Sequence, residues 1–162
     1  NCKVLGVKTG VMKMFIQRSM LITIPAVRGI TTEFTPGVPH MSPSLKFCRY
    51  PAWGNKKDEG PPLVLLGGTA SVLESWAPHV KPLSRSREVI LVEALGQGTS
   101  TAEDCRMESQ VASLHTCLAT DLGLTSVDVA GVSFGGRLGV ALARGKDTTL
   151  VRRLHVTGVG VK

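Results

Sequence analysis

The feature that most constrains the fold is a repeated order from Pro61 onward: a short apolar run, then glycines, then a helical pattern. Apolar runs of four to seven residues bounded by turn residues are typical of strands buried on both faces. The predicted strands are 63–66, 89–92, 127–131 and 151–157, and the predicted helices are 71–83, 101–122 and 138–144. Strands that alternate with helices require right-handed crossovers. The sequence therefore predicts an α/β fold with a mostly parallel, doubly wound sheet.

Two of these helices carry an apolar face at helical spacing. In 101–122 the stripe consists of Met107, Val111, Leu114, Leu118 and Leu122. We expect Thr101 to cap this helix and Gly123 to end it in a left-handed conformation. In 71–83 the expected buried face is Val72, Trp76 and Val80.

One motif carries chemistry, the Gly-x-Ser-x-Gly run at 131–135. A β-branched strand leads into it and a helical pattern follows, which is the setting of a nucleophile elbow. In such a turn Ser133 is held in a strained conformation with its hydroxyl projecting, and Gly131 and Gly135 lack side chains that would clash. Gly136 lets the next helix pack closely. The phosphate-binding patterns Gly-x-Gly-x-x-Gly and Gly-x₄-Gly-Lys-Ser/Thr do not occur.

The order of segments from Pro61 to about Gly158 resembles the N-terminal half of the α/β-hydrolase fold family. Five pieces carry the resemblance: 62–68 to the strand and its oxyanion motif, 73–76 to the next helix, 93–100 to a glycine loop, 121–136 to the elbow, and 151–154 to the following strand. Gly67 stands where the family usually has histidine. Glu93 and Leu95 stand where it usually has aspartate and arginine, so an interaction common in the family is expected to be lost.

The resemblance implies a role for each site residue. Ser133 would be the nucleophile that forms an acyl-enzyme, and the backbone N–H groups of Phe134 and Thr69 would form the oxyanion hole. The glycines at 67, 68, 131, 135 and 136 would support the two turns. The implied substrate is a small-molecule carboxylic ester or a related acyl compound, and neither a cofactor nor a metal is predicted.

The acid and histidine that complete a serine triad are not assigned. In this family they follow the serine along the chain. After Ser133 the sequence has only Asp147, in a loop at the wrong end of the sheet, and His155, inside a strand. His40, His79 and His115 precede Ser133 at positions the family does not use. The sequence thus predicts a sheet truncated after the 151–157 strand, and a nucleophile without its activating partners.

The chain divides by composition into a basic leader at 1–32, a linker at 33–44 and a partial α/β-hydrolase domain at 45–162 that opens with a strand near 45–50. Residues 1–60 hold nine Lys or Arg against three acids, whereas residues 61–162 hold ten against nine. The net charge of +7 therefore belongs mainly to the N-terminal part and does not indicate a nucleic-acid partner. The leader is either an organelle-targeting peptide of a mitochondrion or plastid or non-native read-through, in which case the cytoplasm is expected.

No apolar run is long enough for a transmembrane segment. The four cysteines show no zinc spacing, and Cys105 and Cys117 on one helix would lie roughly 18 Å apart. Three interpretations stay open: an acyl-cleaving serine hydrolase, a non-catalytic binding or scaffold domain of the same fold, and an inactive or degenerate fragment. Substrate identity, a cap domain and oligomeric state leave no mark in the sequence.

Overall fold

The computed structural model describes residues 37, 39–41, 45–55, 60–100, 102–145, 147 and 149–160. The predictions for the 1–32 leader and for the Thr101 cap lie outside these residues. The strands are β1 (Pro39–Met41), β2 (Lys46–Tyr50), β3 (Leu63–Leu66), β4 (Val89–Val92), β5 (Val127–Val132) and β6 (Val151–Thr157). The helical elements are η1 (Leu73–Trp76), α1 (Ala77–Leu83), α2 (Met107–His115), η2 (Thr116–Asp121) and α3 (Phe134–Ala143).

The strands form one sheet in the order β1-β2-β4-β3-β5-β6. Strands β3, β4, β5 and β6 pair in parallel, and β1 and β2 join antiparallel at one edge. The predicted mostly parallel α/β sheet is therefore confirmed. Because β5 and β3 are parallel neighbours, their carboxyl ends lie side by side, and so do the turns that follow them.

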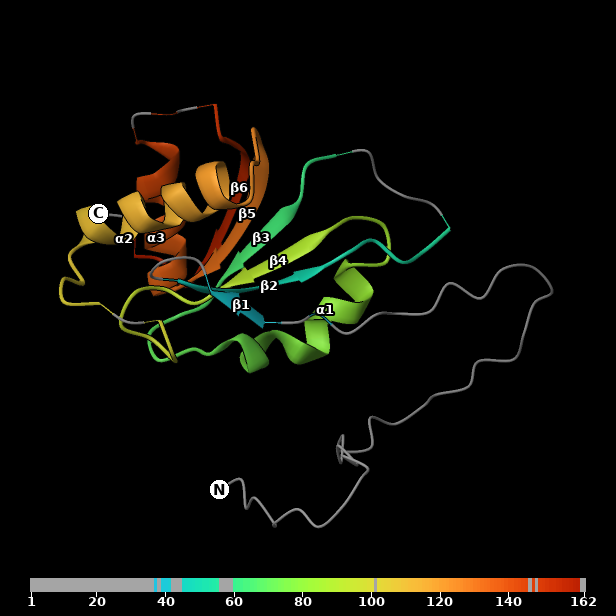
Figure 1. Ribbon diagram of the computed structural model, residues 1–162, viewed down its shortest axis with the longest axis horizontal. Coiled ribbons are helices and arrows are strands. Elements are labelled where there is room, and N and C mark those ends of the chain that lie inside the picture. The colour runs from blue at the N-terminus through green and yellow to red at the C-terminus, as the bar shows by residue number, and fades with distance from the viewer. Residues whose placement is uncertain are drawn as a thin grey trace, which may run out of the picture. The chain divides into compact units, whose positions relative to one another are not determined.

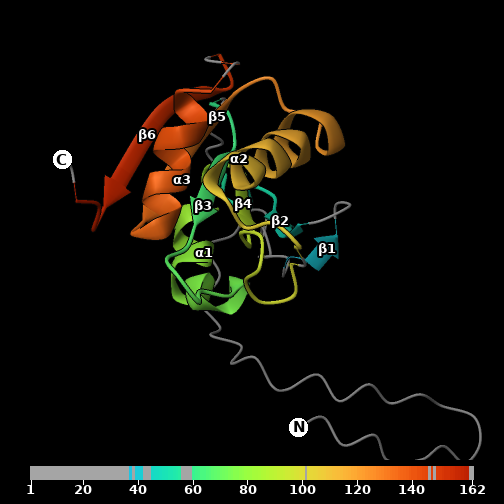
Figure 2. The ribbon, with the colours of Figure 1, turned by 90° about the vertical axis from the view of Figure 1, so that its left-hand side faces the viewer.

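Helices cover both faces of the sheet, with α2 and α3 on one face and η1 and α1 on the other (Figures 1 and 2). Because a strand is pleated, successive side chains point to opposite faces of the sheet and pack against different helical layers. Val64 and Leu66 of β3 pack with Leu114 and Leu138 under α2 and α3. Leu65, between them, packs with Leu73 and Val80 on the other side.

The 101–122 helix was predicted too long at its start. Helix α2 begins at Met107, because Asp104 accepts a hydrogen bond from the Arg106 backbone N–H at 2.9 Å and thus forms a competing turn. After His115 the helix widens into the π-helical turns of η2, and Leu122 N–H donates to Cys117 O at 3.0 Å. Gly123 ends it with a φ of 64°, as expected.

Three other boundaries differ from the sequence prediction. Pro39–Met41, predicted as linker, forms the edge strand β1 against β2. Helix α3 begins at Phe134, directly after the serine, and not at Leu138. In the 71–83 segment Val80 is buried, but Val72 is exposed, because the segment starts as the short 3₁₀ turn η1 and not as an α-helix.

A partly buried ion cluster stabilises β5 near its N-terminal end. The Asp128 carboxylate lies 2.8 Å from Arg152 Nη2 and 2.9 Å from Arg87 Nη2. Hydrogen bonding to the Arg152 guanidinium, with a further contribution from Arg87, lowers the pKa of Asp128 to about 2. This cluster lies at the opposite end of β5 from Ser133, so it belongs to the packing of the sheet.

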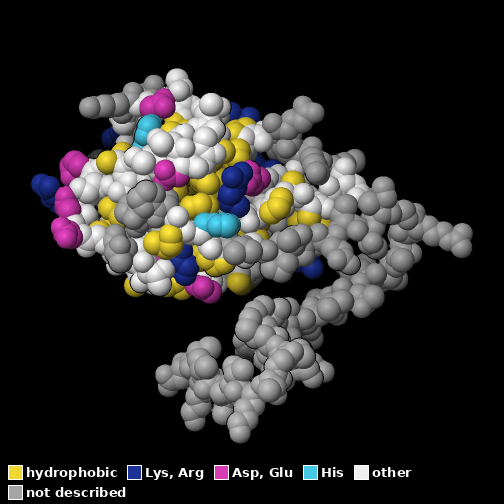
Figure 3. Space-filling view, in the orientation of Figure 1, with side chains coloured by type: hydrophobic (Ala, Val, Ile, Leu, Met, Phe, Trp, Pro, Cys, Tyr) yellow, Lys and Arg dark blue, Asp and Glu magenta, His cyan; other side chains and the backbone are white. Residues whose placement is uncertain are grey.

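Acidic and basic side chains are interspersed among apolar ones on the face drawn in Figure 3. Cys48, Cys105 and Cys117 are free thiols. The prediction that Cys105 and Cys117 share one helix is wrong, because Cys105 precedes the first residue of α2. Among the described residues no group of His, Cys, Asp and Glu side chains is arranged to hold a metal ion. Within that same part of the chain, none of the helices combines the length and apolarity needed to cross a membrane.

Candidate active site

Ser133 occupies a one-residue turn between β5 and α3. Its φ of 53° and ψ of −114° lie in a region that L-residues rarely adopt, and its backbone N–H donates to Thr157 O at 2.9 Å. Strain of this kind persists only where the surrounding structure imposes it, and it is common at functional sites. The residue is exposed, so its hydroxyl is accessible at the end of the sheet.

Backbone contacts explain why glycines flank this serine. A Cβ on Gly131 would lie 2.5 Å from Gly135 O, and one on Gly135 would lie 2.5 Å from Gly67 O. A Cβ on Gly136 would lie 3.2 Å from Gly131 O and would overlap the Val159 side chain. The predicted spacing role of Gly131, Gly135 and Gly136 therefore has a direct steric basis in the structure.

The turn after β3 lies beside the serine. A Cβ on Gly68 would be only 3.5 Å from Ser133 Cβ, so the two segments predicted to cooperate are adjacent. Ser71 N–H donates to Gly68 O at 3.2 Å and closes a four-residue turn. Thr69 is its second residue, and Ala70, its third, has a φ of 62°, where glycine is usual.

The loop after β4 supports this turn through Glu93. Its side chain is 1% exposed. One carboxylate oxygen accepts from Leu73 N–H at 3.1 Å, and the other accepts from Thr99 N–H at 3.0 Å. Glu93 thereby joins the start of η1 to the 93–100 loop, while Lys46 Nζ lies 3.8 Å away.

A buried glutamine fixes the same loop to α2. Gln110 accepts from Leu95 N–H at 2.8 Å and donates to Leu95 O at 3.0 Å. Leu95 itself is buried in the core beneath α2. No sequence pattern pointed to this contact or to that of Glu93, because each joins a side chain to backbone groups far along the chain.

The structure does not bring a histidine to Ser133. Among the described residues none of the four histidines hydrogen-bonds the serine. His155 pairs with Ala130 in the β5–β6 ladder. Ala130 precedes Ser133 by three residues, which places His155 roughly 10 Å from the serine along the strand direction. His115 Nε2 lies 3.5 Å from Asp147 Oδ2, away from the elbow. Hydrogen bonds from Thr149, with a smaller contribution from His115, lower the pKa of Asp147.

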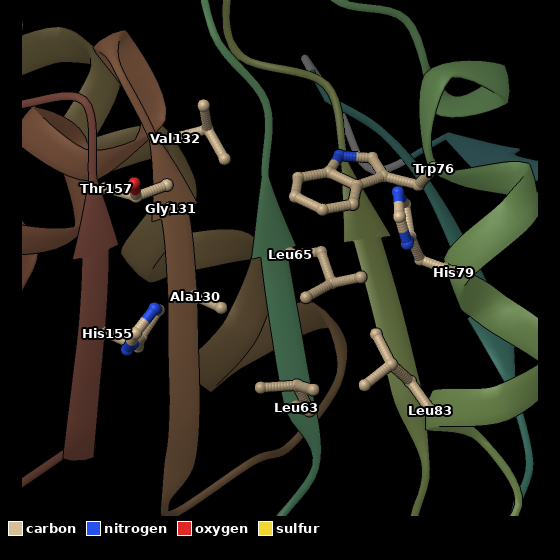
Figure 4. A pocket seen from close by; sticks show the side chains of 10 residues that line it. All are labelled: Leu63, Leu65, Trp76, His79, Leu83, Ala130, Gly131, Val132, His155 and Thr157. Carbon is tan, nitrogen blue, oxygen red and sulfur yellow. The ribbon is translucent and has the colours of Figure 1, made fainter.

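The other two histidines make ring contacts. His40 stacks on Phe47 with ring centroids 5.5 Å apart, and His79 meets Trp76 edge-on at 6.0 Å. His79 and His155 lie on opposite walls of an open hollow of about 250 Å³ on the α1 side of the sheet (Figure 4). The floor consists of strand residues such as Leu65 and Ala130.

The family model described as alpha/beta hydrolase fold matches residues 61–159. The (E)-2-((N-methylformamido)methylene)succinate hydrolase of Acinetobacter baylyi is 34% identical over 105 residues, which cover 62% of this chain and 38% of that protein.

Solved structures agree on the fold. An alpha/beta hydrolase fold protein from Chitinophaga pinensis superimposes with a TM-score of 0.61 at 22% identity, covering 76% of this chain and 44% of that one. An esterase from a marine microorganism gives a TM-score of 0.60 at 27% identity, with 71% and 41% covered. The chain thus spans about two fifths of the length of these relatives.

Proposed function

Because this chain belongs to the alpha/beta hydrolase fold family, we propose that it carries the nucleophile of a serine hydrolase that cleaves a carboxylic ester or related acyl bond. The observation that carries the proposal is the strained Ser133 turn, at φ 53° and ψ −114°, directly beside Gly68. At this junction of a parallel strand and a helix, a glycine would adopt the same backbone conformation with less strain. The presence of a serine there therefore favours a function for its hydroxyl group.

In the proposed reaction the Ser133 hydroxyl oxygen attacks the acyl carbonyl carbon. The hydroxyl proton passes to a general base and the carbonyl oxygen becomes an oxyanion. When the intermediate collapses, the bond to the leaving oxygen breaks, that oxygen takes the proton from the base and departs as the alcohol, and an acyl-serine remains. Water then attacks the acyl-serine, which releases the acid and restores the hydroxyl.

Two backbone donors are proposed to stabilise the oxyanion. Phe134 is the first residue of α3, so its N–H has no partner within the helix and lies at the positive end of the helix dipole. Thr69 N–H belongs to the turn whose Gly68 lies beside Ser133. Removal of one such donor typically slows the reaction by about 10²–10³.

The reaction also requires a base and an acid that the described residues do not place beside Ser133. Without them a serine hydroxyl is a weak nucleophile, and loss of a triad member costs several powers of ten in rate. The second candidate function is a non-catalytic binding domain of the same fold. The name of the Acinetobacter relative supports a small-molecule substrate, and the acyl compound itself is left open.

A fluorophosphonate probe separates the two functions, because it forms a covalent adduct only with an activated serine. In the full-length protein from its native source we expect a stoichiometric adduct on the peptide that contains Ser133, lost in Ser133→Ala. Ser86→Ala is the matched control, since Ser86 is also exposed but precedes β4, at the opposite edge of the parallel sheet. Absence of the adduct from the wild-type protein would favour the binding domain.

A further inference from the structure

Gln97 belongs to the loop that follows β4, and its side chain lies against the turn beside Ser133. It lies between Gly96 and Gly98, whose φ angles of 73° and 54° turn the chain sharply on either side. Its backbone is fixed at both ends, since Gln97 N–H donates to Ala94 O at 3.1 Å and Ser100 N–H donates to Gln97 O at 2.9 Å. The side chain therefore projects from a rigid base.

That side chain reaches the turn after β3. With its amide nitrogen toward the turn, Gln97 Nε2 donates to Gly68 O at 3.0 Å and to Ser71 O at 3.2 Å. The opposite orientation would set the amide oxygen against these two carbonyl acceptors, so the hydrogen-bond partners decide which way the amide faces. A single side chain thus binds both ends of the Gly68–Ser71 turn.

The turn needs such external support. Its third residue is Ala70 at a φ of 62°, a conformation that costs an alanine about 1–3 kcal/mol. Apart from the Ser71–Gly68 hydrogen bond, the turn is exposed at Thr69 and Ala70. The space between Gly67, Ser71 and Gln97 is only about 10 Å³, room for at most about one water.

We propose that Gln97 is a positioning residue that clamps the Gly68–Ser71 turn, so that Thr69 N–H stays directed at the oxyanion formed at Ser133. The inference rests on the proposed acyl chemistry of Ser133. Gln97 touches neither substrate nor reacting atoms, and it acts through the backbone of the turn that it holds.

The clamp predicts a specific kinetic effect. A loosened donor stabilises the transition state less than a fixed one, whereas substrate binding elsewhere is unaffected. Gln97→Met keeps the length of the side chain but removes the donors, and we expect kcat to fall about tenfold with KM nearly unchanged. Gln97→Glu places acceptor oxygens against both carbonyls and is expected to slow the reaction further.

The matched control is Gln110→Met. It makes the same chemical change in a glutamine that supports the same 93–100 loop, but at Leu95 and not at the turn. We expect it to lower the melting temperature and leave kcat within about twofold of the wild-type value, since the Gly68 and Ser71 contacts remain.

The experiment measures hydrolysis of p-nitrophenyl acetate by the full-length protein and, separately, hydrogen exchange of the Ser71 amide, which donates to Gly68 O within the turn. Exchange should accelerate in Gln97→Met and not in Gln110→Met. In a Thr69→Pro background, where the proposed N–H donor is absent, Gln97→Met should add little to the loss of rate.

Three results would overturn the clamp: unchanged Ser71 exchange in both Gln97 variants, equal rate losses in the Gln97 and Gln110 variants, or fully additive losses with Thr69→Pro. Failure of the proposed function gives a different result, because wild-type protein would then form no phosphonate adduct on Ser133. The exchange measurement still tests the clamp in that case, since it does not depend on catalysis.

Discussion

Replacement of Ser133 by glycine should make the protein more stable while abolishing the proposed chemistry. The backbone at this position has a φ of 53° and a ψ of −114°, which glycine adopts without the steric penalty of a Cβ. Ser133→Ala keeps the Cβ and hence the strain. The two substitutions remove the same hydroxyl but differ in the backbone energy of the turn.

The magnitude follows from two opposing terms. Release of the strain is worth about 1–3 kcal/mol. The greater freedom of glycine in the unfolded chain costs about 0.5–1 kcal/mol. The central values of the two terms differ by about 1 kcal/mol, so Ser133→Gly should raise the free energy of unfolding by about that amount. Ser133→Ala should stay within about 0.5 kcal/mol of wild type, since Ser133 is exposed.

Urea unfolding of the 162-residue chain, followed by circular dichroism, measures both variants against the wild type. The comparison needs a single cooperative transition with the same slope in all three proteins. Equal stabilities of Ser133→Gly and Ser133→Ala, or a less stable glycine variant, would refute the idea that the elbow is strained.

Three further changes test the packing around the site by the same unfolding assay. Asp128→Asn should cost about 2 kcal/mol, because it removes the charge that pairs the Asp128 carboxylate with the partly exposed Arg152 guanidinium. In the wild type the pKa of Asp128 is lowered to about 2, so above pH 4 the ionised carboxylate adds about 2 kcal/mol to the free energy of unfolding. This contribution should disappear as the pH falls toward 2, and the variant should lack it at every pH. Gly135→Ala should cost about 1–3 kcal/mol or more, because the new methyl group overlaps the Leu66 carbonyl. Leu114→Ala, at a 1% exposed position, should cost about 2–5 kcal/mol. Losses below about 0.5 kcal/mol at Gly135 or Leu114 would contradict the packing described.

The strands and the elbow were predictable because their signals are local. Four-residue apolar runs such as 63–66 and 89–92 form strands with the predicted bounds. The glycines around Ser133 indicated a tight turn, and each faces backbone atoms that a Cβ would meet. Patterns of this kind depend on neighbouring residues, so the sequence alone contains them.

Helix starts and loop contacts were not predictable in the same way. The 101–106 segment has acidic residues that suit a first helical turn, but Asp104 binds the Arg106 backbone N–H and guanidinium instead. The contact of Gln97 with the turn after β3 joins residues 29 and 26 positions apart. It depends on the pairing of β3 with β4, which no local pattern reveals.

The central proposal is an acyl-enzyme on Ser133, and its most direct test is mass spectrometry of the full-length protein quenched during turnover of p-nitrophenyl acetate. We expect one added acetyl group, located on the peptide that contains Ser133, with release of one equivalent of p-nitrophenol before steady state. An unmodified Ser133 during demonstrable turnover, or an acetyl group that persists in Ser133→Ala, would contradict the proposal.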